Sequence, residues 1–276
     1  VGLTDDLYIK MNSRGKPLTD FEYFKAGFSE ILNKPEQRER FEKSIDGEWI
    51  DAVWNIVFNE NRFSNETDIA VEVDNAFLNL FNFITSVIAL KNDVKTEGGL
   101  NYRNTVDTAD LVKVIYTEEL NQNILFETLD AISRQQQNEP LFWINSFYVG
   151  KEEFSSEKTR LFFQHKEPNL LNRCLFHSHF YRGLSLPEQL LLHSCFVQLK
   201  TQSADFEKRI RIIRNLAVNS ENELREINMG GSFNEVEQFV LNGDLEIFEN
   251  FKTDQIDDEK LKTEFLSESP LDIAFL

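Results

Sequence analysis

The sequence has 276 residues, of which 41% are hydrophobic, and its 25 phenylalanines supply enough bulky apolar side chains for a substantial core. Its formal net charge of −18 repels the DNA backbone, because nonspecific DNA binding needs basic residues that displace counterions. The composition therefore excludes a disordered chain, and we expect no direct DNA contact from this acidic segment.

The first informative stretch is residues 7–32. Residues 7–11 alternate apolar and polar side chains, which predicts a short strand, and Asn12 to Pro17 end it in a turn. Thr19 and Glu22 have the spacing of a reciprocal capping box, so a helix is expected to begin here. Apolar residues then recur at helical spacing and predict one core-facing side: Phe21, Phe24, Phe28, Ile31 and Leu32.

This strand, turn and helix start is suited to an anion. The basic residues Lys10, Arg14 and Lys16 surround a helix start whose free N–H groups carry partial positive charge, and Gly15 lets a phosphate approach the backbone. The alternative is an ordinary corner with a solvated basic turn, since the segment matches neither a P-loop nor the dinucleotide-binding glycine pattern.

The segment Tyr8-Ile-Lys-Met-Asn-Ser-Arg-Gly-Lys-Pro-Leu-Thr-Asp-Phe-Glu22 resembles the Phe-x-x-Ile-Asn-x-x-Gly-x-x-Leu-(Ser/Thr)-x-x-Glu segment of the GmrSD N-terminal family. That resemblance implies a bacterial protein with a ParB/sulfiredoxin-like nucleotide-hydrolysing core, acting in modification-dependent DNA restriction and phage defence. It further implies that Asn12, Arg14, Gly15 and Lys16 form a second wall of a nucleoside triphosphate site, with Mg²⁺ in the parent protein.

Two family motifs are absent from this sequence: the Asp-Gly-Gln-Gln-Arg motif that precedes the segment, and the histidine-containing nuclease motif near the C-terminus. The chain begins at Val1 without Met and ends without a cap, so we expect a fragment of a larger protein. Its first partner would be the missing N-terminal half, and the fragment alone is expected to be inactive.

The remaining sequence predicts helices, because few residues are glycine or proline and the apolar residues are spaced helically. The expected helices span 37–44, 47–59, 68–91, 108–116, 118–137, 157–164, 168–181, 188–201, 205–219 and 232–242. The fold class is therefore mainly α, a multi-helix bundle with a short β element near the N-terminus. We expect a strand–turn–helix element at 1–33 and an all-helical domain at 34–276, subdivided near 92–104 or 183–187.

We expect specific structural roles for several side chains in these helices. Trp49 and Trp54 are interpreted as core anchors, since their acidic neighbours disfavour base stacking. Ser232 and Glu235 repeat the capping pattern, directly after a break at Gly230-Gly231. The apolar stretch 76–90 is interrupted by polar residues and predicts a buried helix, not a membrane span.

Candidate metal and nuclease residues are few. Cys174, His177, His179, His193 and Cys195 form the one conceivable metal cluster, but their spacing fits no zinc signature, and we expect no metal site. Two cysteines form no disulfide framework, which favours a reduced, cytoplasmic protein.

The helix 205–219 carries Lys208, Arg209, Arg211 and Arg214 on an acidic chain. We favour pairing with acidic helices over a phosphate or nucleic-acid contact. The run from Arg214 to Asn219 nearly matches the Arg-x-x-x-x-His motif of HEPN ribonucleases, but an asparagine amide cannot act as acid or base, so that activity is rejected.

Two functions remain. The first is the helical portion of a GmrSD-like, nucleotide-dependent DNA restriction protein that contributes a phosphate-contacting turn. The second is a non-enzymatic helical scaffold whose acidic, phenylalanine-rich body docks on other protein subunits. Affinity for anions at the Arg14 turn distinguishes them.

Overall fold

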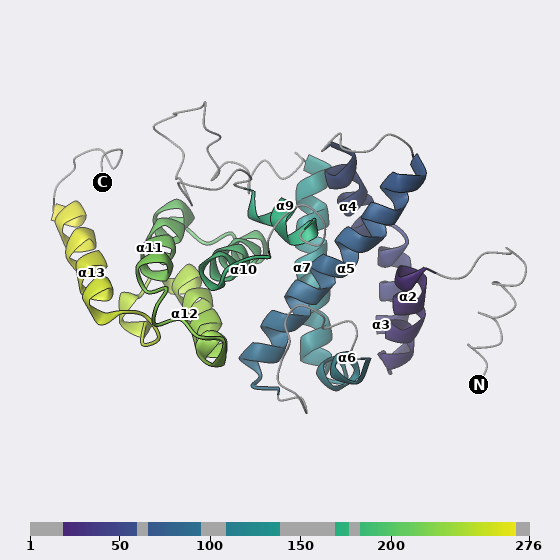
Figure 1. Ribbon diagram of the computed structural model, residues 1–276, viewed down its shortest axis with the longest axis horizontal. Helices are drawn as coiled ribbons and strands as arrows, with labels where there is room; N and C mark the ends of the chain where they lie inside the picture. The colour runs from purple at the N-terminus through teal and green to yellow at the C-terminus, as the bar shows by residue number, and fades with distance from the viewer. Residues whose placement is uncertain (1–18, 60–65, 95–108, 139–168, 177–182, 269–276) are drawn as a thin grey trace, which may run out of the picture. The chain divides into compact units, whose positions relative to one another are not determined.

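The computed structural model describes residues 19–59, 66–94, 109–138, 169–176 and 183–268, and these are helical with no strand among them (Figure 1). The predicted mainly helical chain is thereby confirmed. The strand expected at residues 7–11 lies outside the described residues and stays a prediction.

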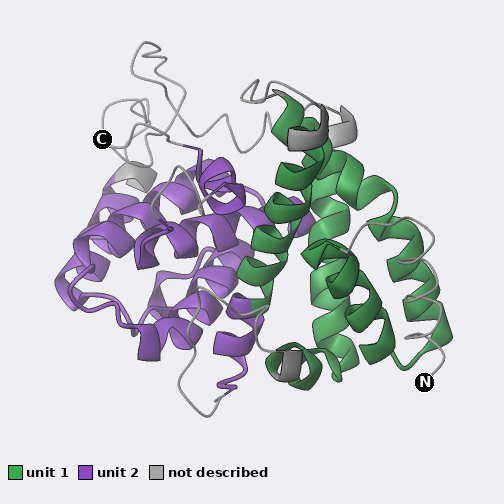
Figure 2. Ribbon diagram, turned by 45° about the vertical axis from the view of Figure 1, so that its right-hand side comes forward, with its two compact units in different colours: residues 1–85, 96–133 green, residues 86–95, 134–276 purple. Residues whose placement is uncertain are grey.

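The chain divides into two compact units (Figure 2). Unit 1 comprises residues 1–85 and 96–133, and unit 2 comprises residues 86–95 and 134–276. The long helix α5 (Glu66–Lys91) contributes its first part to unit 1 and its last turns to unit 2. The domain boundaries expected from the sequence stay predictions.

Unit 1 joins five further helical segments to the first part of α5. Pro35 begins the second of them, where its missing N–H costs no hydrogen bond. The segments are α2 (Asp20–Ile31), α3 (Pro35–Ile45), α4 (Glu48–Asn59), α6 (Ala109–Tyr116) and most of α7 (Glu119–Asn138).

An aromatic cluster forms the core of unit 1. The buried ring of Phe28 on α2 lies with its centroid 4.8 Å from Phe41 on α3, 5.4 Å from Phe81 on α5 and 5.0 Å from Tyr116 on α6. Tilted and edge-to-face contacts of this kind add to the hydrophobic gain from burying the rings. The Tyr116 hydroxyl hydrogen-bonds Thr85 at 2.8 Å, so the one polar atom of this ring is satisfied inside the core.

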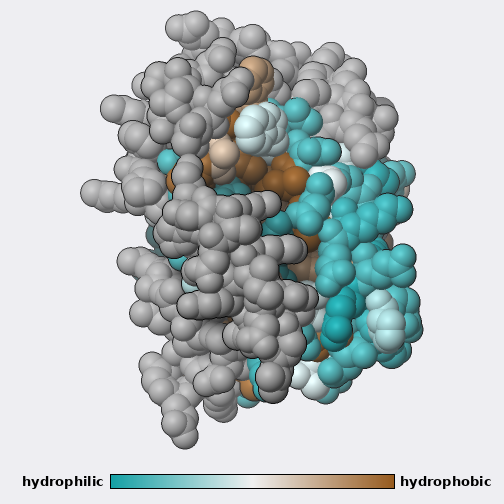
Figure 3. All heavy atoms as spheres, turned by 90° about the vertical axis from the view of Figure 1, so that its right-hand side faces the viewer, coloured by the Kyte–Doolittle hydropathy of each residue, from teal (hydrophilic) through white to brown (hydrophobic). Residues whose placement is uncertain are grey.

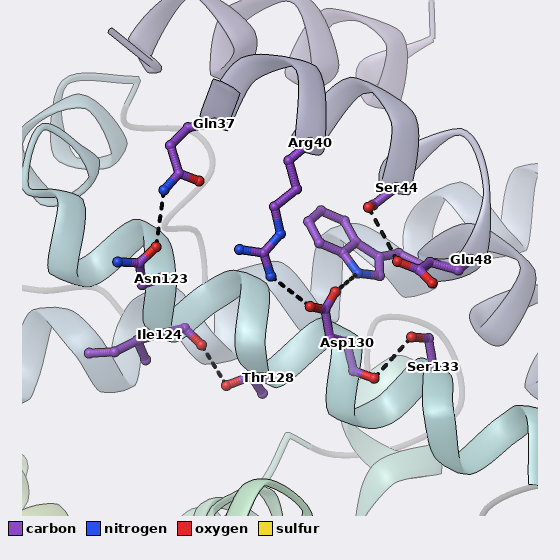
Figure 4. A network of polar contacts seen from close by, with 10 residues as sticks. Gln37, Arg40, Ser44, Glu48, Asn123, Ile124, Thr128, Asp130 and Ser133 are labelled. Carbon is purple, nitrogen blue, oxygen red and sulfur yellow. Dashed lines mark hydrogen bonds and ion pairs between the residues drawn. The ribbon is translucent and has the colours of Figure 1, made fainter. Parts of the chain in front are cut away.

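A polar seam joins α3 and α4 to α7 (Figure 4). The Asp130 carboxylate accepts from Arg40 Nη2 at 2.6 Å and from Trp49 Nε1 at 2.7 Å. Gln37 donates to Asn123 at 3.1 Å further along α7. One carboxylate thus satisfies two donors from different helices, which sets the register of α7 against its neighbours.

The two tryptophans of α4 differ in burial. Trp49 is 1% exposed, whereas Trp54 is 37% exposed and Phe58 is 56% exposed. The expectation that both tryptophans anchor the core is therefore wrong for Trp54. Five helical residues turn the chain about 140° beyond a full revolution, so Trp54 lies well away from the inward direction of Trp49.

One described helix segment, Ile69–Lys91, has the length and apolar composition of a membrane span, and 61% of its most apolar window is buried within the protein. The expectation of a buried helix at 76–90 agrees with the burial of most of its side chains.

Unit 2 is built around three helices that pack on one another, α10 (Leu186–Thr201), α11 (Phe206–Asn219) and α12 (Met229–Asn242), and α13 (Thr253–Glu268) packs against α11. Short elements complete it: α9 (Leu170–Leu175), η2 (Glu226–Asn228) and η3 (Leu245–Ile247). The predicted inward face of α11 is confirmed, since its apolar residues are buried: Phe206, Ile210, Ile213 and Ala217.

Two helix ends in unit 2 differ from expectation. The helix expected at 168–181 is shorter, because α9 ends at Leu175 and the Phe176 amide turns back to the Asn172 carbonyl. The helix expected from Glu188 begins at Leu186. The Glu188 carboxylate accepts from the Ser185 amide at 2.7 Å, so Glu188 completes a cap instead of opening the helix.

The start of α12 corrects another prediction. The helix begins at Met229, so Gly230-Gly231 lies inside it and is no break. The Ser232 hydroxyl donates to the Asn228 carbonyl at 3.3 Å and does not cap the helix. A Cβ on Gly230 would collide with the Leu90 carbonyl oxygen. Glycine is placed here because the end of α5 approaches closely, a reason that local sequence does not display.

Candidate functional site

The residues predicted to contact phosphate, Asn12, Arg14, Gly15 and Lys16, lie outside the described residues. The structure begins three positions after Lys16, at Thr19, which is the N-cap of α2. The described part of the candidate site is therefore the start of α2 and the side chains that pack against it.

The predicted capping box is confirmed. The Thr19 hydroxyl oxygen accepts from the Glu22 amide at 3.2 Å, and the Glu22 carboxylate accepts from the Thr19 amide at 2.9 Å. This pair fixes the backbone direction with which the chain enters α2.

Asp74 of α5 also faces this helix start. Its half-buried carboxylate lies close enough to Lys25 and Thr19 for both side chains to influence it. Burial raises the pKa of Asp74, and Lys25 together with the Thr19 side chain offsets only part of the rise. One turn further along α5, Phe77 packs edge-on against Phe21, with centroids 5.3 Å apart. Sequence patterns gave no signal for Asp74, because it is one carboxylate among many on a predicted helix.

The described side chains at this helix start are mostly acidic. Asp20 and Glu22 lie in the first turn of α2, with Asp74 opposite. Lys25 is paired with Asp46 at 2.6 Å. Hydrophilic side chains cover most of the described surface seen in Figure 3, beside a smaller apolar area. These carboxylates do not attract an anion, so none of them supports the predicted phosphate contact of Arg14 and Lys16.

Three of the candidate metal residues lie in the described part of the chain: Cys174, His193 and Cys195. Cys174 and Cys195 are free and buried, and burial raises the pKa of both thiols to about 12. His177 and His179 lie outside the described residues. Within the described ranges, no group of three or more histidine, cysteine or acidic side chains is placed to hold a metal ion.

His193 instead belongs to a buried network in unit 2. Its Nε2 lies 3.2 Å from the Glu237 carboxylate, which also binds Lys91 Nζ. Burial lowers the pKa of His193, and Glu237 only partly opposes this. Burial alone would raise the pKa of Glu237, but His193 and Lys91 together lower it to about 2.

Acid is expected to destabilise unit 2 through this network. Because the folded pKa of Glu237 is depressed, the unfolded chain binds its proton more tightly, and stability is lost as the pH falls from about 4.5 towards about 2. The loss is on the order of 2 kcal/mol, allowing for the 28% of the side chain that is exposed. His193 acts in the same direction below its ordinary pKa of 6.5.

Urea denaturation at about pH 7 and about pH 3.5 measures the part of this loss that develops above pH 3.5. In Glu237→Gln the acid-dependent loss is expected to shrink, whereas exposed Glu207→Gln on α11 serves as the matched control and retains it. If Glu237→Gln and the unsubstituted chain lose the same free energy of unfolding on acidification, the assignment of the loss to Glu237 is contradicted.

Arg209 of the basic helix α11 makes a structural contact with α12. Arg209 Nη1 donates to the Val240 carbonyl at 2.6 Å, next to Gly243, which ends α12 with a φ of +76°. Asn215 beside Arg214 donates to the buried Glu259 carboxylate of α13 at 3.0 Å. Arg209 thus satisfies a backbone carbonyl at a helix end, where a positive charge is favourable.

No protein-family model, curated protein or solved structure matches the chain. The GmrSD resemblance therefore depends on residues 8–22 alone.

Proposed function

We propose that this chain is the helical portion of a bacterial GmrSD-like protein that restricts DNA in a nucleotide-dependent reaction, and that Asn12, Arg14, Gly15 and Lys16 contact nucleotide phosphate. The observation that carries the proposal is the fifteen-residue resemblance at 8–22. The last residues of that segment, Thr19 and Glu22, form the reciprocal cap of α2.

The chemistry of the turn supports a phosphate ligand. The Arg14 guanidinium presents two parallel donors that match phosphate oxygens, and it is the main charge-stabilising group. Lys16 adds a point charge, Asn12 an amide donor, and Gly15 a backbone without a Cβ that a phosphate can approach. When bound, Mg²⁺ would neutralise part of the triphosphate charge in the parent protein.

Net charge determines which roles we propose for this chain and which for the rest of the parent protein. With a net charge of −18, this segment is not the surface that meets DNA. The remainder of the parent protein supplies the nucleotide-hydrolysing motif and the DNA contact, and this chain contributes one wall of the nucleotide site.

The second candidate function is a helical docking scaffold without enzymatic activity. It is favoured by two apolar side chains one turn apart on α4, Trp54 and Phe58, which are 37% and 56% exposed. Exposed aromatic residues at this spacing are typical of helix faces that bind protein partners.

The test is isothermal titration calorimetry of the chain with ATP and GTP. Arg14→Ala is expected to weaken binding at least about tenfold, because a charge-assisted pair of hydrogen bonds is lost. Arg225→Ala is the matched control, since Arg225 is an exposed arginine of unit 2 that bonds the Leu224 carbonyl. If the unsubstituted chain binds neither ATP nor GTP, the proposed nucleotide contact is contradicted. The docking scaffold is then the favoured function.

A further inference from the structure

The helix α13 of unit 2 has an inner face that its contacts with α11 define (Figure 1). Ile256 is 6% exposed and Glu259 is 3% exposed. The Glu259 carboxylate accepts from Asn215 Nδ2 on α11 at 3.0 Å and from Lys262 Nζ at 2.8 Å. These contacts fix which side of α13 is turned inward, and the direction of the opposite side follows from them.

Two large apolar side chains lie on that opposite side. Leu261 is 64% exposed and Phe265 is 63% exposed. They are four residues apart in the sequence, so they are neighbours on the helix surface and form an apolar pair. At about 100° per residue, Leu261 lies about 140° and Phe265 about 180° around the helix axis from Ile256. The outer face of α13 thus presents an apolar pair that is mainly open to solvent.

Exposed carboxylates extend this outer face. Asp254 and Asp258 continue the row of the apolar pair towards the start of the helix, at the same spacing of three or four residues. Asp257 and Glu264, which are also exposed, lie along one edge of the row. The outer face is therefore apolar at one end and negatively charged at the other end and along one edge.

We propose that the outer face of α13 binds a basic amphipathic helix of another protein. A helix that sets its apolar side chains on the apolar pair brings its polar flanks beside Asp254 and Asp258, which attract lysine or arginine and repel glutamate. The two lysines of α13 are engaged elsewhere, Lys260 with Glu246 at 2.7 Å and Lys262 with a carboxylate of the inner face at 2.8 Å. The proposed contact does not depend on the nucleotide site.

The charge of this face disfavours other occupants. In a symmetric pair of chains, the outer face of each copy would meet the same face of the other, so Asp254 and Asp258 would lie near identical carboxylates. The net charge of −18 on each chain adds to the repulsion. A membrane surface rich in anionic lipids is repelled for the same reason. Apolar contact and charge together fit a basic partner.

The probe is a fluorescein-labelled peptide of about 18 residues, with leucine along one helical face and lysine on the other. A peptide with glutamate in place of every lysine is the control for charge. Fluorescence anisotropy with the full chain gives the Kd of each peptide. We expect the lysine peptide to bind at least about tenfold more tightly than the glutamate peptide.

A double variant, Leu261→Ser with Phe265→Ser, locates the binding face. We expect the Kd of the lysine peptide to rise at least about tenfold, because the apolar anchors of the contact are lost. The matched control is Ile227→Ser with Leu241→Ser, two apolar residues of η2 and α12 that are 90% and 43% exposed, and its Kd is expected to change less than about twofold. Circular dichroism verifies that all variants keep their helical content.

A second double variant, Asp254→Asn with Asp258→Asn, tests the charged part of the face. The Kd of the lysine peptide is expected to rise about threefold or more at low salt and to depend less on salt concentration. Glu223→Gln with Glu226→Gln, which removes two exposed carboxylates between α11 and α12, is the control and keeps the salt dependence of the unsubstituted chain.

Three results overturn the proposal. If the lysine peptide does not bind, or binds Leu261→Ser with Phe265→Ser as tightly as the unsubstituted chain, the outer face of α13 is not its site. If the glutamate peptide binds equally well, the partner is not basic. If sedimentation velocity shows a dimer that the same double variant dissociates, the occupant is a second copy of this chain.

Discussion

Replacing Trp49 by alanine is expected to lower the free energy of unfolding by about 3 to 5 kcal/mol. Trp49 is 1% exposed, and its ring lies with its centroid 5.3 Å from Phe126 and 6.2 Å from Phe41. Alanine leaves a large cavity between α3, α4 and α7. It also removes the indole donor that reaches Asp130 at 2.7 Å.

Two companion variants separate these contributions. Trp49→Phe keeps most of the ring volume but loses the N–H and part of the indole, so we expect a loss of about 1 to 3 kcal/mol. Asp130 keeps Arg40 at 2.6 Å in that variant. Trp54→Ala is the matched control on the same helix, and because Trp54 is 37% exposed its loss is expected to be clearly smaller.

Urea denaturation followed by far-ultraviolet circular dichroism measures the losses, and hydrogen exchange in α4 and α7 assigns them to unit 1. If Trp49→Ala destabilises the protein no more than Trp54→Ala, the aromatic cluster does not support unit 1 as described.

Breaking the buried ion pair between Arg173 and Glu188 is the second large expected effect. The two side chains are 7% and 1% exposed, and they join α9 to the start of α10. Glu188→Gln leaves the Arg173 charge buried without the Glu188 carboxylate beside it, which is expected to cost about 3 to 5 kcal/mol. Glutamine still has an oxygen for the Ser185 amide, so the cap is retained.

The double variant Arg173→Met with Glu188→Gln tests the coupling. The double variant also removes the buried Arg173 charge, so we expect its loss of stability to be smaller than that of Glu188→Gln alone. Asp46→Asn, which breaks the exposed pair with Lys25, is the control with little expected change.

Denaturation in urea gives each free energy, with hydrogen exchange in α9 and α10 as the local readout. If the double variant loses as much stability as Glu188→Gln alone, or more, the interpretation is contradicted, because the two residues then do not act as a coupled pair.

Local sequence patterns predicted a helical feature correctly where the residues that produce it lie within one or two turns of each other. The capping box of Thr19 and Glu22 and the inward face of α11 are of this kind, because spacings of three and four residues place side chains on one helix face. The sequence pattern gave a wrong prediction at α12, where Gly230 was expected to break the helix. A glycine is needed at this position because the backbone of Leu90, 140 positions earlier in the chain, approaches it closely.

The sequence by itself determined the helical class and the acidic charge, and it supplies the residues of the predicted turn, including Arg14 and Lys16, that carry the functional proposal. Only the tertiary structure showed that Asp130 meets Trp49 and that Lys91 meets Glu237, and it alone decided that Trp54 is exposed. The physical reason is that periodicity orients a side chain relative to its own helix. The partner that it meets depends on how helices distant in sequence pack, which no local spacing encodes.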